Sequence, residues 1–144
     1  MKIKEIMRAP VMVEFDSTVR QAAAVMKEKG IGSVLVCMNG KNCVILTELD
    51  ILNRVVAKWL DASKTRVAEV MTKALVTIDA ETDIEKASEV MREHNIRRLP
   101  ITEKSKIVGI VTARDIAKNI SFYYAKKFSD RDFERPHYYE ERMK

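Results

Sequence analysis

One stretch in the second half of the chain reads Gly109-Ile110-Val111-Thr112-Ala113-Arg114-Asp115. Its apolar run ends at Thr112 and predicts a buried strand, and the aspartate three positions later predicts the first turn of a helix. A carboxylate at such a junction can accept two hydrogen bonds from a vicinal diol, as an acidic residue does for a nucleotide ribose. The alternative is a capping box between Thr112 and Asp115 that binds no ligand.

The same pattern occurs earlier in the chain, as Val44-Ile45-Leu46-Thr47-Glu48-Leu49-Asp50. Thr47 and Asp50 lie 65 positions before Thr112 and Asp115, and from position 10 onward this offset holds without a gap. The chain therefore contains two copies of one unit, each so small that we expect it to pack against the other. We place the first repeat at 1–62, the second at 66–124 and a tail at 125–144.

Each copy predicts the order strand, helix, strand, strand, helix. In the first copy we expect a strand at 11–13 and a helix opened by Ser17 and Thr18 and stopped by Gly30. We then expect strands at 31–38 and 43–46 around an Asn39-Gly40 turn, and a helix from about Glu48. In the second we expect a strand at 75–78, a helix with a Thr82–Glu85 capping box that ends at Asn95, strands at 96–102 and 107–111, and a helix after Thr112. The fold class is α/β, with two pseudo-symmetric β-α-β-β-α repeats packed sheet to sheet.

Composition excludes several classes of function. The 144 residues are 47% hydrophobic and 33% charged, as in globular proteins, and the net charge of +5 favours neither nucleic acid nor a small anion. We find no nucleophile–base pair, metal-ligand cluster or glycine-rich phosphate loop, so we do not expect an enzyme. Without an apolar span or signal-peptide pattern we expect a cytoplasmic protein that does not enter a membrane. Cys37 and Cys43 lack zinc or redox spacing, so we expect reduced, packed thiols.

The tail has no counterpart in the first repeat. We expect it to prolong the last helix through Tyr124 and Phe128 and to break at Pro136. Residues 123–144 contain six Lys/Arg and five Asp/Glu, which is unlike a basic arm for nucleic acid. Docking on a neighbouring surface and partial disorder both remain open.

The repeats resemble a pair of CBS domains, the Bateman module named for cystathionine β-synthase. The matching motifs are Ile6-Met7 and Val70-Met71, the strand Asn95-Ile96-Arg97-Arg98-Leu99-Pro100-Ile101, and the Thr-x-x-Asp ending, which is complete in the second repeat. The resemblance covers residues 3 to about 121. It implies an energy-sensing regulatory module that needs no cofactor and binds AMP, ADP, ATP or S-adenosylmethionine in two clefts between the repeats.

The resemblance also implies which residues bind the ligand. In one cleft, Thr47 and Asp50 would hold the ribose, and Arg97 and Arg98 would bind the phosphate. The other cleft would be formed by Thr112 and Asp115, facing Gly32 and Ser33. The adenine base would be lined by Val11 and Val76. Strand alternation predicts that only one of the two arginines points into a cleft. Arg114 is a candidate to replace the missing basic pair of the second cleft, or it points to solvent.

Two departures from the family pattern leave alternatives open. Val44 stands where the second repeat has Gly109, and Gly32-Ser33 stand where it has two arginines. We therefore expect the first cleft to favour phosphorylated ligands and the second to discriminate poorly between adenosine and AMP, or to remain empty. The competing expectation, from the intact Gly109 motif, is that the second cleft is the better formed one. We also expect a homodimer through helical faces that include Val56, Trp59 and Ile120, with output through an unknown effector protein. The alternative is a structural or protein-interaction module whose clefts stay empty.

Overall fold

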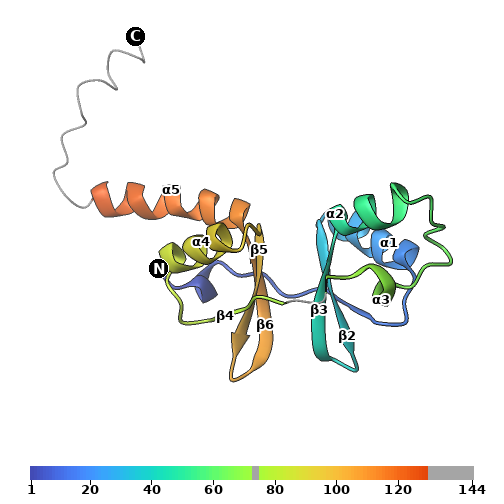
Figure 1. Cartoon of the computed structure of the whole chain (residues 1–144). Helices are drawn as coiled ribbons and strands as arrows, with labels where there is room; N and C mark the ends of the chain where they lie inside the picture. The colour runs from blue at the N-terminus through green and yellow to red at the C-terminus, as the bar shows by residue number, and fades with distance from the viewer. Residues whose placement is uncertain (73–74, 130–144) are drawn as a thin grey trace, which may run out of the picture.

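The computed structural model describes residues 1–72 and 75–129, except for the side chains of 126–129. The first repeat contains β1 (Met12–Glu14), α1 (Val19–Lys29), β2 (Ser33–Met38), β3 (Lys41–Thr47) and α2 (Glu48–Ile51), which continues as the π-helical η2 (Leu52–Val56). The second contains β4 (Ile78–Asp79), α4 (Ile84–Glu93), β5 (Arg98–Glu103), β6 (Lys106–Thr112) and α5 (Ala113–Ser129). Short helices η1 (Ile3–Glu5) and α3 (Val67–Val70) precede them. The predicted order of elements is confirmed (Figure 1).

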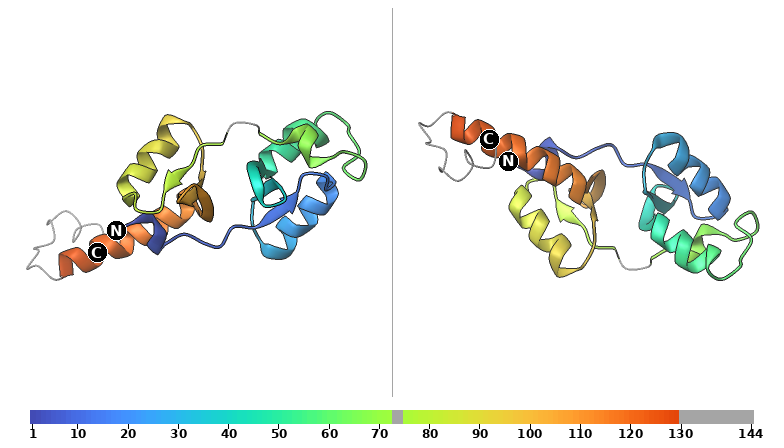
Figure 2. Two further views of the ribbon diagram at one scale, coloured as in Figure 1. Left: turned by 90° about the horizontal axis from the view of Figure 1, so that it is seen from below. Right: turned by 90° about the horizontal axis from the view of Figure 1, so that it is seen from above.

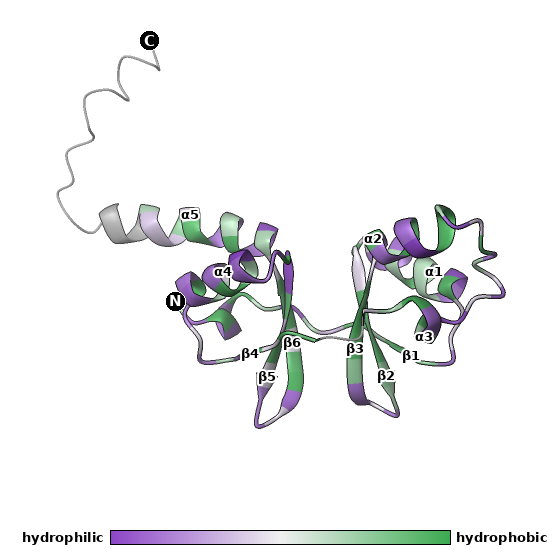
Figure 3. Cartoon of the chain, in the orientation of Figure 1, coloured by the Kyte–Doolittle hydropathy of each residue, from purple (hydrophilic) through white to green (hydrophobic). Residues whose placement is uncertain are grey.

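The two sheets have the same topology. β2 lies between a parallel β1 and an antiparallel β3, and β5 lies likewise between β4 and β6. Figures 1 and 2 show the sheets near the middle of the molecule with the helices on their outer sides. Apolar residues are concentrated along the strands (Figure 3), and the central strand β2 is buried from Ser33 to Cys37. The α/β class with two similar repeats is confirmed.

Each repeat has its own hydrophobic core, but the segments that lead into the repeats, residues 3–8 and 67–72, each pack on the opposite repeat. We call these segments the lead-ins. Ile3, at the start of the first repeat, is fully buried in the core of the second, and its N–H donates to the Thr82 carbonyl at 2.7 Å. Val67, which leads into the second repeat, is fully buried in the core of the first and bonds the Ser17 carbonyl at 2.9 Å. An ion pair from Lys4 to Glu81 also holds the first lead-in, and it raises the pKa of Lys4. The division of the sequence at 62–66 therefore does not divide the packing.

Local backbone signals lie where the sequence predicts them. The Thr18 hydroxyl accepts from the Gln21 N–H and caps α1, and Gly30 ends that helix at a φ of 63°. Asn95 adopts a φ of 51° after α4. Asn39 and Gly40 both have positive φ between β2 and β3, as a tight hairpin turn requires.

The predicted start of the second repeat is wrong in two details. α4 begins with Asp83 as its N-cap, so Thr82 and Glu85 are one position out of register for a capping box. The reason is the exchanged lead-in, because the Met1 carbonyl accepts the Ile84 N–H at 3.1 Å and supplies what a side-chain cap would. The strand predicted at 75–78 begins only at Ile78, as β4.

The expectation of two free thiols is also wrong. Cys37 on β2 and Cys43 on β3 form a disulfide across the hairpin. Val36 pairs with Val44 and Met38 with Lys41, so β3 contains one extra residue at this point. A bulge with Asn42 at a φ of 52° accommodates it and brings Cys43 beside Cys37.

The last helix extends to Ser129, which confirms its predicted continuation through Tyr124 and Phe128. The remaining tail, including Pro136, lies outside the described residues. Among the residues that are described, no helix is both long and apolar enough to cross a membrane.

Candidate ligand-binding site

Two threonine–aspartate pairs cap the helices that follow β3 and β6. At the first, the Thr47 N–H donates to Asp50 Oδ2 at 2.9 Å and the Asp50 N–H donates to the Thr47 hydroxyl at 3.2 Å. At the second, the corresponding distances between Thr112 and Asp115 are 3.0 and 3.1 Å. Both pairs are therefore capping boxes, and each carboxylate keeps acceptor capacity beyond the box. We call the surroundings of Asp50 the first site and those of Asp115 the second site.

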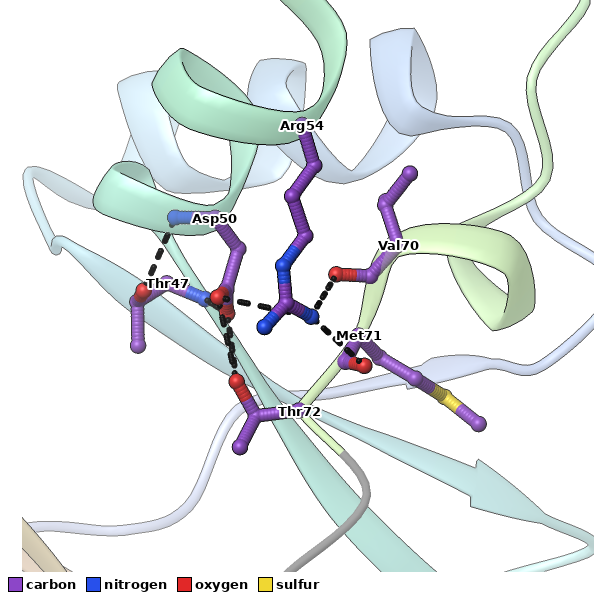
Figure 4. A network of polar contacts seen from close by, with 6 residues as sticks. All are labelled: Thr47, Asp50, Arg54, Val70, Met71 and Thr72. Carbon is purple, nitrogen blue, oxygen red and sulfur yellow. Dashed lines mark hydrogen bonds and ion pairs between the residues drawn. The ribbon is translucent and has the colours of Figure 1, made fainter.

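The Asp50 carboxylate is nearly buried, with 8% of the residue exposed, and it is held from the other repeat. The Thr72 hydroxyl lies 3.0 and 3.2 Å from its two oxygens (Figure 4). Arg54 Nη1 lies 3.9 Å from Oδ1, outside hydrogen-bond range, because it donates to the carbonyls of Val70 and Met71 at 2.9 and 3.1 Å. A neutral hydroxyl is thus the direct partner of this carboxylate.

The Asp115 carboxylate has a charged partner instead. Arg8 Nη2 donates to its Oδ1 at 2.5 Å, and the aspartate is only 4% exposed. The Arg8 backbone is fixed by two hydrogen bonds of 2.9 Å with Ile110. Arg8 and Thr72 occupy equivalent places, since the two lead-ins are offset by 64 positions. Each lead-in therefore caps the aspartate of the opposite repeat.

Gly109 allows the first lead-in to pass. A Cβ at this position would lie 2.6 Å from Met7 Sδ and 3.1 Å from the Arg8 carbonyl oxygen. In the first repeat Val44 fills the equivalent position, and both Val44 and Met71 pack against the core of that repeat. The close backbone approach at Gly109 thus serves the chain's own lead-in.

Arg98 reaches from the second repeat to the first site. Its backbone pairs with Thr112 in the β5–β6 ladder, while its Nη2 lies 3.2 Å from Glu48 Oε1, beside Thr47. A Cβ on Gly32 would collide with Arg98 Nη2, so the glycine makes room for the guanidinium. The Arg97 side chain is exposed, in agreement with the predicted alternation.

The other predicted residues are less clearly grouped. Gly32 lies against the Arg98 and Glu48 side chains, and its carbonyl accepts the Glu48 N–H at 3.0 Å. Ser33 is buried and pairs with Thr47 in the sheet, and Arg114 is exposed. Val11 packs against the core of the first repeat and Val76 against that of the second, both partly buried.

Sequence reasoning missed four residues at these sites: Arg8, Glu48, Arg54 and Thr72. The repeat in Met7-Arg8 and Met71-Thr72 was the available signal for two of them, and the four-residue spacing from Asp50 for Arg54. Within the described part of the chain, no group of three or more His, Cys, Asp and Glu side chains could hold a metal ion.

Comparison with known proteins gives a consistent picture. A CBS domain model matches residues 3–57 and 67–121. The CBS domain-containing protein YhcV of Bacillus subtilis is 37% identical over 118 residues, which are 81% of this chain and 84% of the relative. A CBS domain protein from Pyrobaculum aerophilum, solved as a complex with AMP, is 26% identical with a TM-score of 0.74 over 85% of this chain and 99% of the other. The hexameric CBS-CP12 protein from bloom-forming cyanobacteria is 29% identical with a TM-score of 0.78 over 86% and 73%. The chain therefore belongs to the CBS-domain family, whose paired domains form a regulatory module.

Proposed function

We propose that this chain is a regulatory module that binds an adenosine-containing ligand at the first site. Thr47 and Asp50 hold the ribose hydroxyls, and Arg98 binds the phosphate. The observation that carries the proposal is that Arg98 crosses from the second repeat to within 3.2 Å of Glu48, in the first turn of the helix that Thr47 and the buried Asp50 cap. The AMP complex of a relative supports the choice of ligand class, with AMP, ADP, ATP and S-adenosylmethionine as candidates.

The contacts of the first site are of a kind that a nucleotide can replace. A ribose hydroxyl can donate to Asp50 where the Thr72 hydroxyl now donates, so no buried charge loses its partner in the exchange. A phosphate can likewise take Arg98 from Glu48, whose side chain is 72% exposed and is easily solvated. Thr72 lies on the lead-in that packs on the first repeat, but the displaced Arg98 comes from the sheet of the second repeat. Binding would therefore change the contact between the repeats, which is a route for signalling to an effector protein.

The remaining residues have secondary parts in the proposal. Val11 and Val76 lie at the entry of the first strand of each repeat and would contact the adenine. Arg97 is exposed and contributes only long-range charge. Ser33, which pairs with Thr47 in the sheet, and Gly32, which admits Arg98, shape the first site from within its own repeat. Thr112, Asp115 and the exposed Arg114 belong to the second site.

Calorimetric titration with AMP and adenosine tests this assignment. Arg98→Ala should weaken AMP binding roughly ten- to hundredfold, since a hydrogen bond to a charged group contributes about 1.5–3 kcal/mol. Adenosine, which lacks the phosphate, should bind the variant as it binds the wild type. Arg97→Ala is the matched control and should leave both affinities unchanged. Failure of AMP, ADP, ATP and S-adenosylmethionine to bind the wild-type protein would refute the proposal.

A second candidate function, a protein-interaction module, is favoured by an exposed apolar surface. We define this surface by Leu49, Leu52, Val56 and Trp59, which are 59%, 54%, 62% and 96% exposed. It fits the proposed homodimer through Val56 and Trp59. Ile120 instead packs against the core of the second repeat, while Phe122 on the same helix is 70% exposed. The titration separates the candidates, because a pure interaction module binds none of the four ligands.

A further inference from the structure

We infer that Arg8 makes the two sites unequal, because its guanidinium occupies the Asp115 carboxylate that a ribose diol would need. The second site then takes an adenosine-containing ligand only weakly, and Arg8 is the residue that sets this difference. The inference rests on the function proposed above, since it concerns the ligand of the same module.

The first step of the argument is the strength of the contact. Arg8 Nη2 lies 2.5 Å from Asp115 Oδ1, and the Asp115 side chain is 5% exposed. A charge-assisted hydrogen bond to a nearly buried carboxylate is stronger than a neutral one, and its removal leaves the carboxylate without its counter-charge. Asp115 Oδ2 is already bonded by the Thr112 N–H at 3.0 Å. Each oxygen of the Asp115 carboxylate therefore already accepts one hydrogen bond, and the bond to Oδ1 comes from a charged donor.

The second step is that the contact is positioned by the backbone. Two hydrogen bonds of 2.9 Å hold Arg8 against Ile110, one residue beyond Gly109. Gly109 has no side chain to push Met7 and Arg8 away. The Arg8 side chain is 66% exposed, so it could extend into solvent, yet it turns toward the aspartate.

The third step is the comparison with the first site, which acts as an internal control. Thr72 occupies the place equivalent to Arg8, and its backbone N–H donates to the Ile45 carbonyl at 3.2 Å. Its uncharged hydroxyl is the group that donates to Asp50, whereas the nearest guanidinium, that of Arg54, lies 3.9 Å from Asp50 Oδ1 and is held by two backbone carbonyls. A ribose hydroxyl replaces another hydroxyl at Asp50, whereas at Asp115 it must displace a guanidinium. We expect this difference to disfavour the second site roughly ten- to hundredfold.

The test uses the full chain and AMP, with one site silenced at a time. Asp50→Ala leaves the second site to be measured alone, and adding Arg8→Thr gives that site the residue found at the first. The double variant should bind AMP ten- to hundredfold more tightly than Asp50→Ala. Asp50→Ala with Arg8→Lys keeps the positive charge and should bind as weakly as Asp50→Ala. The reciprocal pair is Asp115→Ala with and without Thr72→Arg, in which the added arginine should weaken the first site.

The outcomes separate this inference from the proposed function. If wild type binds AMP at two sites of equal affinity and Arg8→Thr changes neither, the inference is wrong and the proposed function stands. If Arg8→Thr weakens the second site, Arg8 is a ligand of the nucleotide and the inference is also wrong. Absence of AMP binding by the wild type and by every variant overturns both. If thermal unfolding shows that Arg8→Thr does not fold, the Thr72→Arg pair decides alone.

Discussion

At the scale of single residues, the ion pair between Arg98 and Glu48 is expected to set the affinity of the first site for phosphate. Its partner Glu48 is a surface carboxylate, and exposed ion pairs of this kind contribute about 0.2–1 kcal/mol. A bound phosphate would have to take Arg98 from Glu48 and would also approach the negative charge of Glu48. The pair is therefore expected to lower the affinity for phosphorylated ligands without being needed for folding.

Glu48→Gln should raise the affinity for AMP about two- to fivefold, which corresponds to the free energy of an exposed ion pair. The affinity for adenosine should stay the same, because adenosine has no phosphate for Arg98 to bind. Calorimetric titration of the wild-type and variant proteins with both ligands measures the difference. An equal gain for adenosine would show that Glu48 acts on the site by another route.

At the scale of elements, the exchanged lead-ins link the stability of each repeat to the other. Ile3→Ala should destabilise the protein by about 2–5 kcal/mol, since it removes a fully buried side chain. The amides of 78–116 should lose hydrogen-exchange protection first, although the change lies at the N-terminus. Val67→Ala is the matched control and should weaken the first repeat instead. If Ile3→Ala loses hydrogen-exchange protection mainly near 19–55, the first lead-in does not stabilise the second repeat.

The β2–β3 hairpin carries the Cys37–Cys43 disulfide, which joins two cysteines with a sequence separation of 6. For so short a loop the chain-entropy estimate is about 2 kcal/mol, and a protein of this size should lose about 4–8 °C of melting temperature on reduction. Differential scanning calorimetry with and without a reductant measures the shift. Cys43→Ser should melt near the reduced wild type and should not respond to the reductant.

Most elements could be predicted because their signals are local. The Asn39-Gly40 turn, the Thr18 cap and the Asn95 stop each depend on a few neighbouring residues, and the 65-residue offset places Asn95 where the first repeat has Gly30. The Thr82–Glu85 box failed because Met1, from the other end of the chain, caps α4. The disulfide was missed because the bulge at Asn42 shifts the register by one residue.

For the two sites, the local contacts could be predicted from the sequence, but the contacts between distant segments could not. Thr47, Asp50, Thr112 and Asp115 form capping boxes whose spacing is visible in the sequence. Their partners Thr72 and Arg8 come from the opposite repeat, so no spacing along the chain indicates the contact. Their roles as ligand residues remain predictions until the titrations are made.

At the scale of the whole molecule, the apolar surface around Trp59 is the feature that folding leaves unexplained. Trp59 is 96% exposed at a φ of 59°, and Leu52 and Val56 nearby are more than half exposed, whereas Val55 between them is buried. The π-helical η2 thus divides its apolar residues between the core and the surface. A large apolar surface of this kind is typical of an interface, and a relative is known as a hexamer.

Light scattering should therefore give a mass of about twice the chain's 16.5 kDa for the wild type. Trp59→Glu should give the monomer, because it places a charge within this apolar surface and desolvating that charge opposes association. The melting temperature extrapolated to low concentration should be unchanged, since the Trp59 side chain has almost no contact within its own chain. Met38→Glu is the matched control, because Met38 is 48% exposed at the tip of the β2–β3 hairpin, away from the surface around Trp59. A Trp59→Glu protein with the wild-type mass, or a Met38→Glu protein that dissociates, would place the interface elsewhere.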